Sequence, residues 1–98
     1  MITMHPGEYL SLSYVEPYKI SSVELSERLG LPVQTIDGLL MQEIELTAEM
    51  AVRFELALGR SAESWLGMQT DHSLMQARKK VVPATVRPFV FPPRKDAA

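Results

Sequence analysis

Cysteine is absent from this sequence of 98 residues. Disulfide bonds, thiolate metal sites and thiol nucleophiles are therefore excluded, and the composition suits a reducing cytoplasm. The sequence also lacks an apolar run near the ~20 residues that a membrane-spanning helix needs, and its first residues lack the basic-then-apolar order of a secretion signal. From these absences we expect a cytoplasmic protein with no membrane partner.

Motifs for catalysis and for cofactor binding are missing as well. The sequence has no glycine-rich phosphate loop and no motif that joins a serine, a histidine and an acid. Its two histidines, His5 and His72, have no second ligand at the i+3 or i+4 spacing of a helical metal site. We therefore expect no enzyme activity, no cofactor, no metal and no small-molecule substrate, and we expect His5 to cap a helix or pack beside Pro6.

Basic residues are missing from the middle of the chain. Residues 29–52 contain no lysine or arginine, and within them residues 29–47 carry the carboxylates of Asp37, Glu43 and Glu45. Residues 1–76 have four basic and eleven acidic groups, a net charge of −7, whereas residues 77–98 have six basic groups and one acidic group, a net charge of +5. A basic tail on an acidic body contacts nucleic acid or an acidic partner, or it only keeps the chain soluble.

Helical periodicity and capping residues predict five helices and an all-α domain over residues 1–80. The first begins near Pro6 and stops before Pro17; the second runs from the Ser21 cap to Gly30, the third begins at Pro32, the fourth runs from the Thr47 cap to Gly59, and the fifth runs from the Ser61 cap to about Lys80. The predicted inward faces of the second to fourth helices contain Val23, Leu25 and Leu29; Ile36, Leu39 and Leu40; and Met50, Phe54, Leu56, Ala57 and Leu58.

The fifth predicted helix carries large apolar residues that suit either the core or a dimer surface: Trp65, Leu66, Met68, Leu74 and Met75. Gly38, inside the third, costs about 1 kcal/mol of helix propensity relative to alanine. That cost indicates either a close approach by another chain or a penalty that the fold tolerates.

Residues 81–98 hold four prolines and are expected to form a tail that is extended or disordered. In extended form, Val86, Phe89, Val90 and Phe91 suit addition along the edge of a partner's sheet. The residues expected to contact a protein partner or phosphate groups are Arg78, Lys79, Lys80, Arg87, Phe89 and Phe91.

Four motifs occur in a fixed order within the run from residue 5 to about residue 80, which is about three quarters of the chain: HPGEYL at residues 5–10, LSERLGL at residues 25–31, LTAEMAVRFELALG at residues 46–59 and SAESWLGMQ at residues 61–69. This series resembles the HigA-type antitoxins, which are small Xre/Cro-like helix-turn-helix proteins encoded beside a ribosome-dependent mRNA-cleaving toxin. The resemblance implies a five-helix lambda-repressor-like fold and a homodimer that binds double-stranded operator DNA. It also implies repression of its own operon and neutralisation of a RelE-like toxin.

The resemblance places the DNA-reading helix at the third predicted helix. The positions that match the family's DNA contacts are Pro32, Val33, Gln34, Thr35, Asp37 and Gly38, with Gln42 in the following loop. Backbone amides near Ser22 and Thr47, at the starts of the second and fourth helices, are further candidates because helix N-termini hold phosphate without charged side chains.

The same positions depart from the family pattern. Val33 and Gly38 stand where arginines are usual, Glu43 stands at a lysine position, and Met41 and Gln42 replace an asparagine and a glycine. A carboxylate that faces the phosphate backbone opposes binding, and each absent cation removes counterion release. The alternative function is therefore a protein-interaction module that keeps the helix-turn-helix but binds DNA weakly or not at all.

Overall fold

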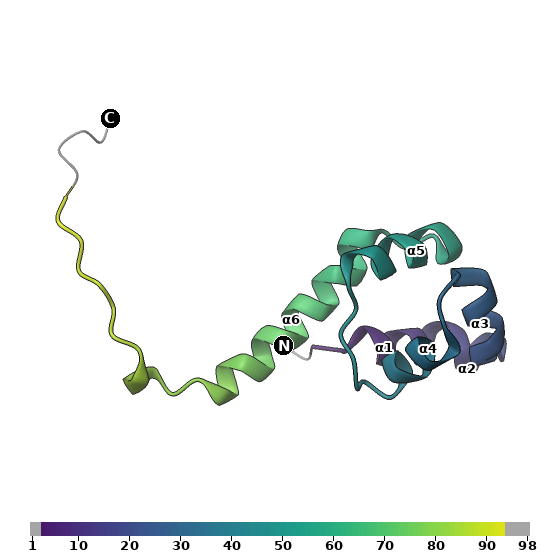
Figure 1. The fold of residues 1–98 in the computed structure, drawn as a ribbon, viewed down its shortest axis with the longest axis horizontal. Helices are drawn as coiled ribbons and strands as arrows, with labels where there is room; N and C mark the ends of the chain where they lie inside the picture. The colour runs from purple at the N-terminus through teal and green to yellow at the C-terminus, as the bar shows by residue number, and fades with distance from the viewer. Residues whose placement is uncertain (1–2, 94–98) are drawn as a thin grey trace.

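The computed structural model describes residues 3–93, and all regular structure in that range is helical (Figure 1). The elements in chain order are α1 (Pro6–Leu10), the π-helical turn η1 (Ser11–Val15), α2 (Glu16–Tyr18), α3 (Ser22–Leu29), α4 (Val33–Leu40), α5 (Ala48–Leu58), α6 (Ala62–Lys80) and the 3-10 turn η2 (Pro83–Thr85). Because α1, η1 and α2 follow one another without a break, they form one continuous helix. The predicted all-α class with five helices is confirmed.

The first helix was predicted to stop before Pro17, but it continues to Tyr18. In η1 the hydrogen bonds span five residues, and the Glu16 N–H donates to the Ser11 carbonyl. This wider turn places Pro17 in the first turn of α2, where a residue without an N–H is tolerated. The helix ends at Lys19, which adopts a left-handed conformation with φ of 54°. The prediction was wrong because periodicity gives no sign of a π turn.

The predicted helix caps are confirmed. Each capping hydroxyl accepts a hydrogen bond from a backbone N–H three residues further on: Ser21 from Glu24 at 3.1 Å, Thr47 from Met50 at 3.3 Å and Ser61 from Ser64 at 3.1 Å. Gly30 and Gly59 end α3 and α5 with φ of 69° and 87°. A side chain is disfavoured in this left-handed region, which is why glycine stands at both positions.

Trp65 lies at the centre of the core and is fully buried. Its ring meets Phe54 edge to face with centroids 4.9 Å apart, and it meets Tyr9 in the same way at 5.4 Å. The other large, fully buried side chains come from α1 and α4: Leu10, Ile36 and Leu39. Aromatic pairs of this geometry are stabilising beyond the area that they bury.

Three residues of the predicted inward faces lie outside the core. Val23 and Ala57 are exposed, and the exposed fraction of Leu56 is 80%. Val23 and Leu56 each stand two positions from a buried residue, Leu25 or Phe54, and a helix turns about 200° over two residues. The apolar patterns of α3 and α5 are therefore broader than their buried faces.

Gly7 determines how closely α1 and α4 approach. A Cβ atom at Gly7 would lie 1.6 Å from the carbonyl oxygen of Leu39 on α4, so no side chain fits there. His5 caps the same helix, as expected, because its Nδ1 accepts a hydrogen bond of 2.9 Å from the Gly7 N–H. Together with Pro6 in the first turn, these residues explain the HPG sequence as a cap followed by a close helix contact.

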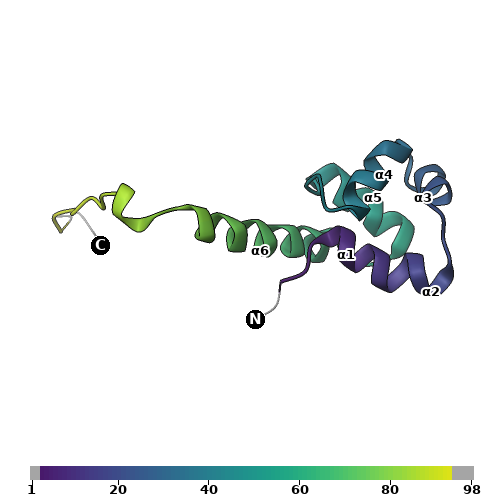
Figure 2. The same cartoon turned by 90° about the horizontal axis from the view of Figure 1, so that it is seen from below.

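The C-terminal half of α6 extends beyond the helical body and leads into the tail (Figures 1 and 2). Residues 81–93 form an extended segment interrupted by η2, and every one of them is exposed. The rest of the predicted tail, residues 94–98, lies outside the described residues. No helix within residues 3–93 is long and apolar enough to cross a membrane.

Candidate nucleic-acid interface

Helices α3 and α4 form a helix-turn-helix whose turn contains Gly30, Leu31 and Pro32. The Gly30 and Leu31 N–H groups both donate to the Ser26 carbonyl, at 2.9 and 3.2 Å. The Ser26 hydroxyl in turn donates to the Leu31 carbonyl, and the Leu31 side chain is buried. The angle between α3 and α4 is thus fixed by local hydrogen bonds and by one buried anchor.

Helix α4 buries one face and exposes the other. Ile36 and Leu39 are in the core, whereas the predicted contact residues Gln34 and Asp37 are exposed. Of the remaining predicted positions on α4 and its turn, Pro32 is exposed, and Val33, Thr35 and Gly38 are half-buried. The structure therefore places the polar side chains of the predicted reading helix on its solvent side.

The segment that approaches Gly38 is the loop of the same chain. A Cβ atom at Gly38 would lie 3.4 Å from the side chain of Ile44, and the Glu43 N–H donates to the Gly38 carbonyl at 2.8 Å. The loop thereby folds back over the end of α4. Gln42, at its tip, is exposed and has a left-handed φ of 60°, where a glycine would be unstrained.

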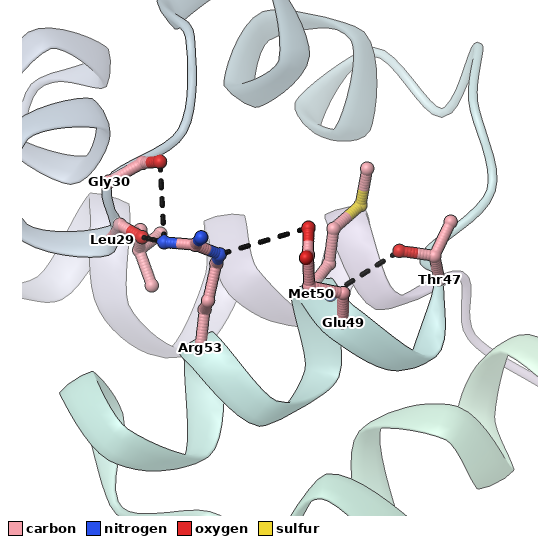
Figure 3. A network of polar contacts seen from close by, with 6 residues as sticks. All are labelled: Leu29, Gly30, Thr47, Glu49, Met50 and Arg53. Carbon is pink, nitrogen blue, oxygen red and sulfur yellow. Dashed lines mark hydrogen bonds and ion pairs between the residues drawn. The ribbon is translucent and has the colours of Figure 1, made fainter.

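Arg53 is a structural residue of the helix-turn-helix that the sequence pattern did not reveal (Figure 3). From α5 its Nη1 donates to the carbonyl of Leu29 at 3.0 Å and to that of Gly30 at 3.4 Å, so it caps the C-terminal end of α3. Its Nε also lies 4.0 Å from a carboxylate oxygen of Glu49. The only signal was that Arg53 is the one basic residue of α5, because the carbonyls it serves are more than twenty positions away.

The two histidines, far apart in sequence, lie edge to face with ring centroids 5.1 Å apart. His5 uses both ring nitrogens, since Nδ1 accepts from Gly7 and Nε2 lies 3.1 Å from the Ile44 carbonyl oxygen. Burial, and then the charge of His72, lower the pKa of His5 below its usual value of 6.5. Among residues 3–93, no group of three or more histidine or acidic side chains is placed to hold a metal ion.

No protein-family model matches the chain. Over 74 residues it is 34% identical to antitoxin HigA-1 of Vibrio cholerae, an alignment that covers 76% of this chain and 70% of that protein. The chain belongs to the HigA antitoxin family. The resemblance in the sequence is thereby confirmed.

Other relatives agree with HigA membership. Over 79 residues the chain is 33% identical to virulence-associated protein I of Dichelobacter nodosus, covering 81% of this chain and 73% of that protein. A HigA-family antidote protein from Coxiella burnetii has a TM-score of 0.81 and 28% identity, over 91% of this chain and all of that one. Antitoxin GraA in complex with its operator also gives 0.81 and 28%, over 93% and 95% of the two chains.

Within this HigA fold, few cations stand near the exposed side of α4. Arg53 is committed to the end of α3, and Arg28 lies 3.5 Å from Glu24, one turn earlier on the same helix. The loop carboxylates of Glu43 and Glu45 are exposed. The exposed carboxylates of the loop and the engaged arginines leave the surroundings of α4 unfavourable to phosphate groups.

The predicted contact residues at helix starts differ in exposure. Thr47 is exposed and uses its hydroxyl as the cap of α5, while Ser22 is half-buried in the first turn of α3. The side-chain caps serve the third residues of these helices, Glu24 and Met50. The earlier N–H groups of each helix have no partner within the helix itself.

The apolar residues predicted as core or dimer surface on α6 divide between the two roles. Trp65 is in the core, and Leu66 and Met68 pack against it. Met75 is half-buried and its sulfur accepts a hydrogen bond of 3.0 Å from the Thr3 hydroxyl, whereas Leu74 is exposed. Leu74 is the only exposed residue of this set, with an exposed fraction of 43%.

Proposed function

We propose that this chain is a DNA-binding antitoxin that represses its own operon and neutralises a RelE-like, mRNA-cleaving toxin. The observation that carries the proposal is an intact helix-turn-helix with an exposed α4 on a HigA-family chain. Two structural relatives were solved with DNA. Antitoxin GraA was solved in complex with its operator, and the antitoxin HigA of Pseudomonas aeruginosa, with 25% identity and a TM-score of 0.80, was solved with the higBA promoter.

Base reading in this proposal rests mainly on Gln34. Its exposed amide on α4 suits a bidentate contact with an adenine edge in the major groove, with Thr35 beside it. Free N–H groups at the starts of α3 and α5, near Ser22 and Thr47, hold the flanking phosphates. Because Asp37 carries negative charge on the same side, we expect weak binding that depends steeply on salt.

A homodimer completes the operator interaction, because one helix-turn-helix contacts too few base pairs for specificity and paired copies match two half-sites. The folded body offers Leu56, the most exposed of its large aliphatic side chains, with Val52 one turn before it on α5. This pair supports a dimer seam on α5, in place of a dimer surface on α6, which was one of the two roles considered for its apolar residues.

In this proposal, the basic end of α6 and the tail that follows it contact different partners. Arg78, Lys79 and Lys80 are exposed at the end of α6, where their positive charges contact phosphate groups. The extended segment that follows binds the toxin, with the rings of Phe89 and Phe91 stacked 5.7 Å apart as aromatic anchors. Residues 81–98 thus act apart from the domain of residues 1–80.

The prolines of the tail support pairing with one sheet edge. In an extended strand the N–H groups of alternate residues point to opposite edges. Pro88 and Pro92 remove donors from one edge, whereas Arg87, Phe89 and Phe91 all keep donors on the other. The tail therefore suits addition to the exposed edge of one partner sheet and resists pairing with a second.

The test of the proposed function is a binding titration against the promoter upstream of the chain's own coding sequence. Wild type should prefer this DNA to a scrambled duplex, Gln34→Ala should lose about 1–3 kcal/mol of that preference, and Glu43→Lys should tighten binding at low salt. Gln76→Ala, an exposed glutamine on α6, is the matched control. A wild-type protein with no preference at low salt would instead favour the protein-interaction module.

A further inference from the structure

The loop between α4 and α5, residues 41–47, is mostly exposed but is fixed from two sides. From the N-terminal side, His5 Nε2 lies 3.1 Å from the Ile44 carbonyl oxygen. From α6, the side-chain oxygen of Gln69 accepts a hydrogen bond of 2.8 Å from the Leu46 N–H. These contacts join segments that are 39 and 23 residues apart in the sequence.

His5 and Gln69 are also the two buried polar side chains found within residues 3–93. A polar group is costly to bury unless it is hydrogen-bonded, and both of these side chains bond to backbone groups of the same loop. Gln69 is itself oriented by α6, since its amide nitrogen donates to the Ser73 hydroxyl at 3.0 Å. Ser73 then donates to the Glu45 carboxylate at 3.4 Å, a second link to the loop.

The hydrogen bonds of His5 define its proton arrangement. Because Nδ1 accepts from the Gly7 N–H, the proton of the neutral ring is on Nε2, which donates to the Ile44 carbonyl. A second proton on Nδ1 would remove the acceptor that caps α1. The charged or titratable groups that face the ring are His72 from α6, Glu45 from the loop and Glu8 from α1.

We propose that His5 and Gln69 are positioning residues for DNA binding, which hold the loop so that α4 and the start of α5 meet the duplex together. The loop connects the exposed end of α4 to Thr47, so its conformation sets the distance between the base-reading side chains and the phosphate-binding amides. This inference rests on the proposed function. It adds a specific role for two residues that are not among the predicted DNA contacts.

The experiment uses the full chain with His5→Asn, Gln69→Met and Ser73→Ala. Asparagine can still cap α1, but it is too short to reach Ile44 and does not titrate. Methionine keeps the length of Gln69 without a strong acceptor for the Leu46 N–H. Thr70→Ala, at the exposed position next to Gln69, is the control. Ser73→Ala provides a milder variant if Gln69→Met does not fold.

Two measurements are made on each folded variant. Amide hydrogen exchange reports the opening of the loop at the Leu46 N–H, and anisotropy reports affinity for the chain's own promoter. We expect faster exchange at Leu46 and about tenfold weaker DNA binding for Gln69→Met, a smaller effect for Ser73→Ala and none for Thr70→Ala. For His5→Asn we expect weaker binding at neutral pH.

The dependence of affinity on pH separates positioning from a general loss of stability. Acidification alone should tighten DNA binding as the protein loses negative charge. If His5 positions the loop, wild type should bind less tightly as pH falls below 6.5 and folded His5 becomes protonated, and His5→Asn should lack this decline. His72→Asn should keep the decline and move its midpoint to higher pH, because His72 disfavours the protonated form of His5.

Faster exchange at Leu46 without any change in promoter affinity would overturn the proposal, while DNA binding by the wild type would still stand. An unchanged exchange rate at Leu46 in Gln69→Met would overturn it as well. Failure of the proposed function is visible separately, as absence of promoter preference in the wild-type protein.

Discussion

At the scale of single residues, glycines that look alike in the sequence have opposite structural roles. Gly7 lies where a Cβ atom would overlap the backbone of α4, while Gly67, inside α6, has nothing within 4 Å of the same position. A backbone clash cannot be relieved by a rotamer change, so α1 would have to move away from α4. Sequence alone does not distinguish these two glycines, because the difference depends on a tertiary contact.

These two glycines give a matched pair of predictions. Gly7→Ala should destabilise the fold by about 3 kcal/mol, because the added atom forces α1 off the Leu39 carbonyl. Gly67→Ala should stabilise it by about 0.5–1 kcal/mol, since alanine is the better helix former at an unobstructed site. Urea unfolding followed by circular dichroism measures both, and equal effects would contradict the close approach of α1 to α4.

His5 also makes stability depend on pH. Its pKa in the folded state lies below the unfolded value of 6.5 because of burial and His72, so below that pH the unfolded chain binds a proton that the folded chain does not. The contribution of neutral His5 to stability is therefore present above pH 6.5 and is lost as pH falls. The free energy of unfolding should decline between pH 7 and 5.5 in wild type and decline less in His5→Asn, and equal declines would exclude His5 as the cause.

At the scale of elements, local signals predicted most of the helices, and long-range contacts account for what was missed. The caps at Ser21, Thr47 and Ser61 and the glycine ends of α3 and α5 are properties of adjacent residues, so the sequence reveals them. The π turn before Pro17 has no such pattern. The exposed face of α4 could be predicted from Ile36 and Leu39, but the contacts of Arg53 with α3 depend on how α5 packs.

Arg53 should therefore contribute more than an ordinary surface arginine. Arg53→Met keeps the aliphatic part of the side chain but removes the donors to Leu29 and Gly30, and we expect a loss of about 1–2 kcal/mol, reduced by the partial exposure of the group. Arg28→Met is the control, since that side chain is 75% exposed and has only a surface ion pair, so its effect should stay within about 0.5 kcal/mol. Equal losses in urea unfolding would contradict the capping role.

At the scale of the whole molecule, an acidic helical body carries a basic tail that extends away from it (Figure 2). Leu56 on α5 is 80% exposed and belongs to the helical body, not to the tail. Dimerisation through α5, DNA contact through α4 and partner contact through the tail would use different surfaces. In the proposed arrangement, the base-reading face of α4 and the toxin-binding residues Phe89 and Phe91 are separate, so these two contacts would not compete directly.

Dimerisation through α5 is tested by a charge at its exposed apolar position. Leu56→Lys should convert a dimer to the monomer of 11.0 kDa at micromolar concentration, because a lysine on each side of a two-fold contact is both repelled and desolvated. Leu74→Lys, at the exposed position on α6, should leave the dimer intact. Sedimentation equilibrium distinguishes the two variants, and dissociation by Leu74→Lys alone would return the seam to α6.

The tail is tested by two truncations that separate Arg78, Lys79 and Lys80 at the end of α6 from the segment after it, which carries Arg87, Arg94 and Lys95 as well as Phe89 and Phe91. Removal of residues 81–98 should abolish binding of the neighbouring toxin in a pull-down, because it removes Phe89 and Phe91, but it should keep most of the salt dependence of DNA binding. Removal of residues 77–98 also takes away Arg78, Lys79 and Lys80. Each phosphate that the protein neutralises contributes about −0.9 to the slope of log K against log salt. The slope should therefore flatten by roughly 0.9 for each phosphate contact that the shorter protein loses. An unchanged slope in the shorter protein would mean that its cations do not meet the duplex, and that the neutral groups of α4 and the helix starts hold DNA despite the surrounding carboxylates.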